Sequence, residues 1–346
     1  MVRLNLNFGN NTYKSRRDCR ADSYALWTLT SPTVFTESEY EAAIAGCGVV
    51  DRSERGKLAL TGADAKSFLQ GQVSNDVESL TAGTGCYAAL LTPKGKMLGD
   101  LRILDTGSEL LLDTERVALQ ELFNMIRRFS IGYDVELHKR TVQRGLLSLL
   151  GPRADAVAAI DGLAEVEHSH VAAEIAGISV RAIRTDVGID LLCDAADTEA
   201  LGAAVQRAGA VPVSAEVADC VRIERGRPRY GIDLDDSVIP QEAGLNERAV
   251  SFTKGCYVGQ ETVARLHYRG KPNRHLRGLQ LSGVAAPGDE IRFDGRLVGR
   301  LASIAQSPAL GPVALALVRR EAPPGSRVTV GADQVGALVV ELPFAR

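Results

Sequence analysis

The chain has 346 residues, 45% of them hydrophobic and 24% charged, which is typical of a globular protein of two to three domains. Its 40 Lys and Arg residues against 43 Asp and Glu residues give a net charge of −3, which argues against a globally basic nucleic-acid-binding protein but not against a local basic patch. Aromatic residues make up only 5%, too few for an extended platform that stacks single-stranded RNA. No apolar run approaches the ~18–20 residues of a membrane helix, so no membrane partner is expected.

The cysteines and the N-terminal residues indicate a reducing compartment, which we take to be the cytoplasm. The six cysteines are widely spaced, with no CxxC pair and no paired Cys/His spacing, so neither a metal site nor a secreted disulfide framework is expected. Residues 1–23 lack the apolar stretch of a secretory signal and are expected to form a disordered tail. Their Asn- and Arg-rich composition leaves an organellar transit peptide, and hence an organellar matrix, as the alternative.

The first two thirds of the chain predict helices and antiparallel hairpins. Apolar residues recur with helical spacing between Leu119 and Phe129, and the turn 92–96 joins two strands. The expected helices are 37–45, 64–69, 119–129, one from Pro152, 197–208 and one after Ser214. The expected strands are 57–60, 84–91, 97–104, 109–113, 145–150, 178–183 and 190–193. Hairpins with intervening helices, rather than repeated βαβ units, indicate an α+β fold.

The sequence pattern changes at residue 275, where short strands separated by Pro, Gly and Asp turns begin. Asp294-Gly295 is typical of a two-residue hairpin turn. The expected strands are 275–281, 290–293, 296–304, 313–318, 327–330 and 334–341. Six short strands without helical periodicity predict a small C-terminal β-barrel. The preceding stretch 225–277 has little periodicity, and a long irregular segment within a compact protein is usually functional.

Within that stretch, the motif KGCYVGQE surrounds a cysteine that is a candidate reactive group. Two glycines allow close approach of a ligand or of another segment of backbone. Lys254 and a helix beginning near Gly259 would both favour the thiolate form of Cys256. The alternative is a small buried hydrophobic residue, and the local physics leaves both open. The motif residues are Lys254, Gly255, Cys256, Tyr257, Gly259, Gln260 and Glu261.

This motif, followed by TVARLHYRG, resembles the signature of the YgfZ family of folate-binding proteins, which are relatives of the glycine-cleavage T-protein, an aminomethyltransferase. DRSERGKLALTGADAKSFLQGQVSNDV, GDL, RIERGRPRYGIDLD and the barrel-like end extend the resemblance over about residues 26–344. The resemblance implies a three-domain cloverleaf around a central folate-binding hole, with two α+β domains that have antiparallel sheets and a C-terminal β-barrel. The implied domains are 24–56 with 142–240, 57–141 and 275–346, with the signature segment at 241–274.

The resemblance also implies four folate-site positions. Asp100 corresponds to an acidic residue near the folate N5 and N10 atoms, where a carboxylate can relay or stabilise a proton. Asp190 corresponds to a glutamate that binds the pterin ring, whose amino group and adjacent N–H offer two donors to one carboxylate. Tyr87 and Arg222 match a tyrosine and an arginine of the same site. Taken singly, these residues would be interpreted as surface charges and as a half-buried strand aromatic.

Two departures from the T-protein pattern favour the YgfZ type. Gly99 precedes Asp100 where T-proteins carry paired aspartates, and Gly255-Cys256-Tyr257 stands where they carry an acidic-aromatic pair. The implied function is that of an accessory protein that binds tetrahydrofolate or a one-carbon-substituted tetrahydrofolate. It would act through Cys256 with iron–sulfur enzymes or assembly proteins, and would support iron–sulfur-dependent tRNA modification. The alternative is an enzyme, a folate-dependent aminomethyl or one-carbon transferase that uses Asp100.

A basic run follows the signature motif. Its residues are solvated loop charges or an anion site, either for the glutamyl tail of folate or for phosphates of a tRNA partner. The run comprises Arg265, His267, Arg269, Lys271, Arg274, His275 and Arg277. Lys57, Lys94 and Lys96 are candidates to extend it, although nothing in the sequence places them there.

Overall fold

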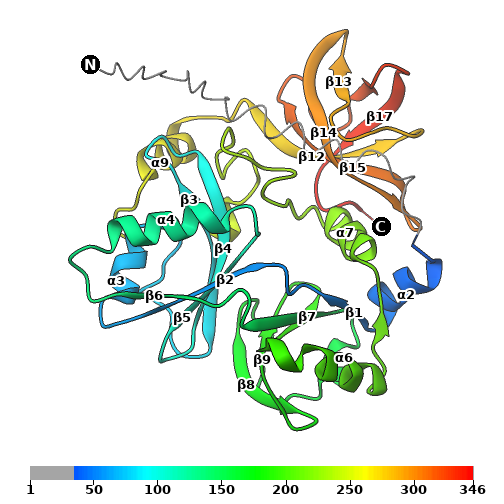
Figure 1. Cartoon of the computed structure of the whole chain (residues 1–346). Coiled ribbons are helices and arrows are strands. Elements are labelled where there is room, and N and C mark those ends of the chain that lie inside the picture. Colours follow the sequence, from blue (N-terminus) through cyan, green and yellow to red (C-terminus); the bar gives the residue numbers. More distant parts are fainter. Residues whose placement is uncertain (1–34, 346) are drawn as a thin grey trace, which may run out of the picture. The chain divides into compact units, whose positions relative to one another are not determined.

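The computed structural model describes residues 35–345, which form two β-sheets, a closed β-barrel and the helices that pack on them (Figure 1). The expected tail, 1–23, lies outside the described residues, and so does Cys19. The paired strands of both sheets and of the barrel are antiparallel, except for one short parallel pair of β1 with β11. The predicted α+β class with a C-terminal barrel is therefore confirmed.

The five-stranded sheet is formed by residues 56–139, in the order β3-β4-β5-β2-β6. Its strands are β2 (Gly56–Thr61), β3 (Thr84–Leu91), β4 (Met97–Asp105), β5 (Leu110–Thr114) and β6 (Glu136–Lys139). Helices α3 (Ala65–Gln70) and α4 (Leu119–Phe129) pack on one face of this sheet. Leu122 and Ile126 lie one helical turn apart on α4 and share a core with Phe68 of α3, as amphipathic spacing requires.

The six-stranded sheet takes one strand from before the five-stranded sheet and the others from after it, in the order β11-β1-β7-β10-β9-β8. Its strands are β1 (Gly48–Asp51), β7 (Arg144–Leu150), β8 (His170–Ile175), β9 (Ile178–Arg184), β10 (Gly188–Asp194) and β11 (Val211–Pro212). The helices that accompany it are α2 (Glu37–Ala45), α5 (Ala154–Ala158), the single 3₁₀ turn η1 (Ala195–Asp197), α6 (Thr198–Arg207) and α7 (Ala215–Glu224). Leu149, Leu191 and Leu201 are fully buried in its core.

The closed barrel follows the order β12-β15-β14-β13-β16-β17. Its strands are β12 (Arg274–Leu281), β13 (Glu290–Phe293), β14 (Arg296–Ser307), β15 (Gly311–Arg319), β16 (Arg327–Val330) and β17 (Val335–Val340). Asp294 and Gly295 both have positive φ, 49° and 75°, which is the backbone that the predicted two-residue turn requires. Ile223 of α7 packs with Val313 and Leu315 of the barrel.

The stretch between α7 and the barrel contains only two short helices, α8 (Asn246–Ala249) and α9 (Gln260–Arg269). Its apolar residues nevertheless form a buried cluster, in which Tyr230, Leu245 and Tyr257 pack with Ala89 and Met97 of the β3–β4 hairpin. The segment is therefore irregular in backbone but well packed. Among the described residues, no helix is long and apolar enough to cross a membrane.

Candidate functional site

One face of the five-stranded sheet carries polar side chains within otherwise apolar strands. Asp100 and Arg102 on β4 lie two residues apart and therefore on the same face, and Arg102 pairs directly with Asp113 on β5. Glu115 follows Asp113 at the same spacing and continues the row just beyond the strand. The residues between them that point into the apolar core on the other face include Leu101, Ile103 and Leu112. The sheet thus presents a row of charged groups on the face away from its helices.

The half-buried Tyr87 and the buried Asp100 form a hydrogen-bonded pair on this face. Tyr87 lies opposite Arg102 in the β3–β4 ladder, so Asp100 is its diagonal neighbour, and the Tyr87 hydroxyl donates to Oδ2 of Asp100 over 2.6 Å. Burial raises the pKa of Asp100 to about 6, although the hydrogen bond from Tyr87 lowers it. A carboxyl group that titrates near neutral pH can take up and return a proton.

Tyr87 is held from its other sides by residues of distant segments. The Arg248 guanidinium lies 5.2 Å from the centroid of the Tyr87 ring and pairs with Glu167. His168 stacks on Tyr87 at 6.4 Å between ring centroids, and its φ of 72° lies in the left-handed region. Burial lowers the pKa of His168 to about 3, so its ring is neutral. Its buried Nδ1 atom has no hydrogen-bond partner in the described part of the chain, which leaves one polar atom available beside Tyr87.

Asp190 joins the two sheets. On β10 it lies opposite Ser148 of β7, whose hydroxyl donates to Oδ1 over 2.6 Å. Its other oxygen, Oδ2, is 2.6 Å from Nη1 of Arg102, which also contacts Asp113 at 2.6 Å. Asp190 is therefore connected to the Asp100 strand through Arg102. Each of its oxygens keeps a further lone pair with which to accept a ligand donor.

Arg222 lies on α7, but it is not the surface charge that its position on a helix would suggest. Its guanidinium contacts Asp219 and Asp233 at 2.7 Å each, and its Nη2 donates to Ser303 of the barrel over 2.5 Å. It also donates to the carbonyl oxygen of Arg227. These contacts join α7, the loop after it and β14, so Arg222 fixes the junction between these elements.

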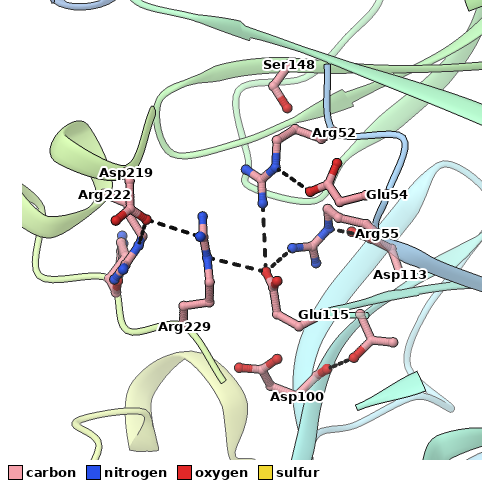
Figure 2. Close-up of polar contacts among 12 residues, drawn as sticks. Arg52, Glu54, Arg55, Asp100, Asp113, Glu115, Ser148, Asp219, Arg222 and Arg229 are labelled. Carbon is pink, nitrogen blue, oxygen red and sulfur yellow. Dashed lines mark hydrogen bonds and ion pairs between the residues drawn. The ribbon is translucent and has the colours of Figure 1, made fainter. Parts of the chain in front are cut away.

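A cluster of arginines that the sequence analysis did not single out surrounds Glu115 (Figure 2). Oε1 of Glu115 accepts a hydrogen bond from Nη1 of Arg55, and the same oxygen lies 3.8 Å from Nη2 of Arg52 and 3.9 Å from Nε of Arg229. Arg55 also contacts Asp113 at 2.7 Å. The cluster is thus continuous with the charged row on β4 and β5.

Cys256 is exposed at the centre of a loop whose two sides are firmly attached. Before it, the Lys254 ammonium donates to the carbonyl oxygens of Gln70, Val73 and Asn75 at 2.5–2.8 Å. Burial lowers the pKa of Lys254 to about 8. The proximity of Lys254 in the sequence predicts that it favours the thiolate of Cys256, but this ammonium is bound to three carbonyl oxygens of another loop.

The residues after Cys256 attach the loop to the β3–β4 hairpin. Tyr257 is buried with Ala89 and Met97, and the Val258 amide donates to the carbonyl oxygen of Gly71 over 3.2 Å. Gly259 has φ +88°, and a Cβ atom there would lie 2.6 Å from the carbonyl oxygen of Thr92.

Three motif residues remain: Gly255 directly before the thiol, and Gln260 and Glu261 directly after Gly259. A Cβ atom at Gly255 would meet no atom within 4 Å. Gln260 and Glu261 form the first turn of α9. The thiol is consequently presented by a fixed loop with open space beside it.

Comparison with known proteins gives the family of the chain. Models of the GCVT N-terminal domain and of the glycine cleavage T-protein C-terminal barrel domain match residues 13–254 and 274–345. The chain belongs to the glycine-cleavage T-protein family. Proteins of this family bind tetrahydrofolate.

Two relatives illustrate the likeness. A protein of Arabidopsis thaliana, named as a chloroplastic transferase, is 29% identical over 310 residues, which are 86% of this chain and 71% of that protein. The crystal structure of glycine cleavage system aminomethyltransferase T from Bartonella henselae has a TM-score of 0.79 at 23% identity, with 89% of each chain covered. The second likeness supports the fold, from the two sheets to the C-terminal barrel.

The basic run after the motif does not act as one surface in this member of the T-protein family. Arg274 binds Glu242 at 2.9 Å and the carbonyl oxygen of Ser237, and Arg277 binds Glu341 at 2.8 Å. His267 stacks on Phe252 with a centroid distance of 3.8 Å. Three residues of the run are exposed on or just after α9 and form no ion pair in the described chain: Arg265, Arg269 and Lys271.

The lysines that were candidates to extend the run are placed elsewhere. Lys57 is buried under the turn between β1 and β2, where its ammonium donates to the carbonyl oxygens of Ser53 and Arg55. Lys96 donates to the carbonyl oxygen of Ser237 over 2.6 Å. Lys94 lies exposed in the turn between β3 and β4.

The structure joins Tyr87 to Asp100 by a hydrogen bond and links Asp190 to the same strand through Arg102, while no hydrogen bond or ion pair in the described chain joins Cys256 to any of them. Arg52, Arg55, Glu115 and Arg229 belong to the same region but were not predicted. One signal was present: charged residues stand two positions apart in Asp113-Thr114-Glu115, as they do in Asp100-Leu101-Arg102. No group of three or more His, Cys, Asp and Glu residues in the described part of the chain has the spacing of a metal site.

Proposed function

We propose that this protein is a tetrahydrofolate-binding protein of the YgfZ type that supports iron–sulfur cluster assembly or repair, and iron–sulfur-dependent tRNA modification, through Cys256. The observation that carries this proposal is the attachment of the Cys256 loop. Lys254 holds one side with three hydrogen bonds, and Tyr257 and Gly259 hold the other, while the thiol itself is exposed. Such an arrangement presents a thiol to a partner rather than packing it in a core.

Folate binding is supported by the donor and acceptor groups near Asp100. Tyr87 fixes one oxygen of the Asp100 carboxyl group, and the raised pKa lets this carboxyl hold a proton near neutral pH. Asp190 retains lone pairs for the donors of a pterin ring, and the unpartnered Nδ1 of His168 offers a further polar atom. When bound, tetrahydrofolate supplies nitrogen atoms that carry a one-carbon unit. The residues present therefore suit this cofactor, with or without a one-carbon substituent.

The partner side of the proposal follows from the number of thiols. Clusters are usually held by four thiolates, and Cys256 is one exposed cysteine, so we place the cluster in a partner, an iron–sulfur enzyme or an assembly protein. A free thiol of this kind persists in a reducing compartment, for which we propose the cytoplasm. The basic run offers Arg265, Arg269 and Lys271 as the groups that would contact a tRNA phosphate.

A second candidate function is a folate-dependent aminomethyl or one-carbon transferase. The observation that favours it is the pKa of Asp100, which burial raises to about 6, because a general acid–base residue works best when its pKa lies near the working pH. In this case Asp100 would be the essential residue and Cys256 would be dispensable.

Cells that lack the protein distinguish these functions. Methylthiolated and thiolated tRNA bases are measured after the wild type, Cys256→Ala or Asp100→Asn is restored, with Cys86→Ala as the matched cysteine control. The accessory role predicts loss with Cys256→Ala and full recovery with Cys86→Ala. Full recovery with Cys256→Ala would contradict it.

An assay in vitro tests the transferase directly. It follows methylene-tetrahydrofolate formation from an aminomethylated lipoyl carrier, and turnover that survives Cys256→Ala but not Asp100→Asn would establish the enzyme. A direct tRNA contact predicts salt-dependent RNA binding that weakens when Arg265, Arg269 and Lys271 are replaced. Lack of RNA binding at low salt would remove that contact from the proposal.

A further inference from the structure

Three guanidinium groups converge on a single carboxylate oxygen, Oε1 of Glu115 (Figure 2). Arg55 makes the hydrogen bond, and Arg52 and Arg229 lie at 3.8 and 3.9 Å, which is beyond hydrogen-bonding distance. A carboxylate oxygen has two lone pairs and cannot serve three forked donors at once. The donors of Arg52 and Arg229 are therefore not used by Glu115.

The other contacts of these two arginines do not use their donors fully either. Nη1 of Arg229 is 3.2 Å from Oδ1 of Asp219, but that oxygen already accepts from Nε of Arg222 at 2.7 Å. In the described chain, the Arg229 guanidinium makes no hydrogen bond that meets geometric criteria. The side-chain hydrogen bond of Arg52 goes to Glu54, whose side chain is 62% exposed.

Both arginines are largely removed from water, with side chains only 21% and 23% exposed for Arg52 and Arg229. Burial lowers the pKa of the Arg229 guanidinium, and Arg222 and Arg52 lower it further, while Asp219 and Glu115 raise it. A half-buried cation that shares its carboxylate partners with other arginines is incompletely compensated, and a ligand anion would stabilise it.

The backbone that carries these arginines is held in place. The Arg52 amide donates to the carbonyl oxygen of Leu146, whose own amide donates to the Ser53 hydroxyl. Beneath the turn, the buried Lys57 ammonium binds the carbonyl oxygens of Ser53 and Arg55. On the other side, the Arg229 amide donates to Asp233 over 2.9 Å. Side chains carried by a backbone that is already fixed lose less conformational entropy when a ligand binds.

The cluster adjoins the proposed folate site. Glu115 continues the row of Asp100, Arg102 and Asp113, and in Figure 2 it lies between Arg52 and Asp100. Glu115 and Arg55 are both close enough to shift the pKa of Asp100. An anion held by Arg52 and Arg229 would therefore lie in the same region of the molecule as a ligand group at Asp100.

We propose that Arg52 and Arg229 form a subsite for a carboxylate group, which the glutamyl tail of folate supplies. The inference rests on the proposed folate binding and names the part of the ligand that these residues recognise. Forked guanidinium donors match the two oxygens of a carboxylate, and the glutamyl tail carries the carboxylates of folate, far from the pterin ring.

Titration calorimetry on the full chain tests this subsite with two ligands. Tetrahydrofolate is compared with tetrahydropteroate, which has the same ring system and no glutamyl tail. The wild type is expected to bind tetrahydrofolate roughly ten-fold more tightly or better, since hydrogen bonds to charged groups are lost without the tail. Arg52→Met and Arg229→Met should each reduce this preference strongly while the affinity for tetrahydropteroate stays unchanged.

Two control variants distinguish the specific loss of a guanidinium group at this subsite from a general effect of removing an arginine. Arg300→Met removes an exposed barrel arginine that pairs with Glu290 and should keep the full preference. Arg229→Lys keeps the positive charge but lacks the forked guanidinium donors, so its preference for tetrahydrofolate over tetrahydropteroate should lie between those of the wild type and Arg229→Met. Equal binding of both ligands by the wild type, or an unchanged preference in both Met variants, would overturn the subsite alone. If neither ligand binds the wild type, the proposed folate function fails, and the subsite fails with it.

Discussion

The hydroxyl of Tyr87 donates to the carboxylate of Asp100 over 2.6 Å, from the diagonal position on the neighbouring strand. The hydrogen bond stabilises the ionised carboxylate, whereas burial opposes ionisation more strongly, and the balance raises the pKa of Asp100 to about 6 from its ordinary value of 3.8. The pair therefore keeps a proton exchangeable near neutral pH at a position where an ordinary aspartate would be fully ionised.

Asp100→Asn is expected to stabilise the protein at alkaline pH. Because the pKa of Asp100 is raised in the folded state, its stabilising contribution is fully present below about pH 3.8 and is lost as the pH rises through about 6. The neutral amide avoids this loss, so the free energy of unfolding should rise by up to about 3 kcal/mol at pH 8. Urea unfolding at pH 8 and pH 5 measures the difference, which should fall to roughly half at pH 5.

The exposed Asp161, replaced by Asn, is the control and should change little at either pH. An equal gain for Asp100→Asn at pH 5 and pH 8 would contradict the assignment, since it would show that charge at Asp100 is not the cause.

Arg222→Met is expected to lower stability rather than to act on ligand binding alone. The substitution leaves the carboxylate of Asp233, whose side chain is 0% exposed, without its ion-pair partner, and it removes the link to Ser303 of the barrel. Loss of one member of a buried pair costs about 3–5 kcal/mol. Thermal unfolding should show a clear fall in Tm, while Arg225→Met, an exposed change on the same helix end, should leave it nearly unchanged.

A role of Arg222 in contacting folate directly predicts a different pattern. In that case Arg222→Met would weaken tetrahydrofolate binding in a variant that keeps its Tm. Measuring the Tm and the tetrahydrofolate affinity on the same preparations decides whether Arg222 stabilises the junction of α7 with the barrel or contacts the ligand.

Element positions were predictable where local signals agree. The bounds of α2, Glu37–Ala45, match the prediction, and a capping box between Thr36 and Glu39 accounts for its start. The barrel strands were predicted because turn residues separate short apolar runs. Strand β6, with the sequence ELHK, was missed because its four residues are largely polar and only its pairing with β2 makes it a strand.

The site was predictable only in part, for a related reason. Tyr87 and Asp100 were named from a resemblance, and their strand spacing is compatible with contact. Arg52, Glu115 and Arg229 come from three distant segments, and no local pattern predicts that they meet. Proximity in the chain was also misleading, because Lys254 binds the loop 70–75 although Cys256 is two residues away.

Gly259→Ala is expected to loosen the Cys256 loop. The residue has φ +88°, which disfavours any side chain, and a Cβ atom would lie 2.6 Å from the carbonyl oxygen of Thr92. A cost of about 1–3 kcal/mol follows, because the backbone must shift or remain strained. Hydrogen exchange of residues 254–259 should become faster in this variant.

Gly255→Ala provides the matched change within the same motif. A Cβ atom there meets nothing within 4 Å, so the loop should keep its exchange rates. If Gly255→Ala accelerates exchange as much as Gly259→Ala does, the hairpin contact at Thr92 is not what holds the loop.

Cys256 is expected to react with iodoacetamide at neutral pH well before four other cysteines of the described chain. Those four are buried or half-buried: Cys47, Cys86, Cys193 and Cys220. Burial raises the pKa of Cys47 to about 11 and that of Cys86 to about 12, so at neutral pH they hold little thiolate, which is the reactive form. Mass spectrometry of peptides along a labelling time course gives the order, and labelling in denaturant gives the reference in which accessibility no longer differs.

Stability measurements on Cys256→Ala complete this test, because exposure and a structural role make opposite predictions. An exposed side chain contributes little packing, so the free energy of unfolding should change by less than about 0.5 kcal/mol. Tetrahydrofolate affinity should persist as well, since no contact joins Cys256 to Tyr87, Asp100 or Asp190 in the described chain. A variant that unfolds readily, together with slow labelling of the wild-type thiol, would make Cys256 a packing residue. The loop held by Lys254 and Tyr257 would then serve the fold rather than a partner.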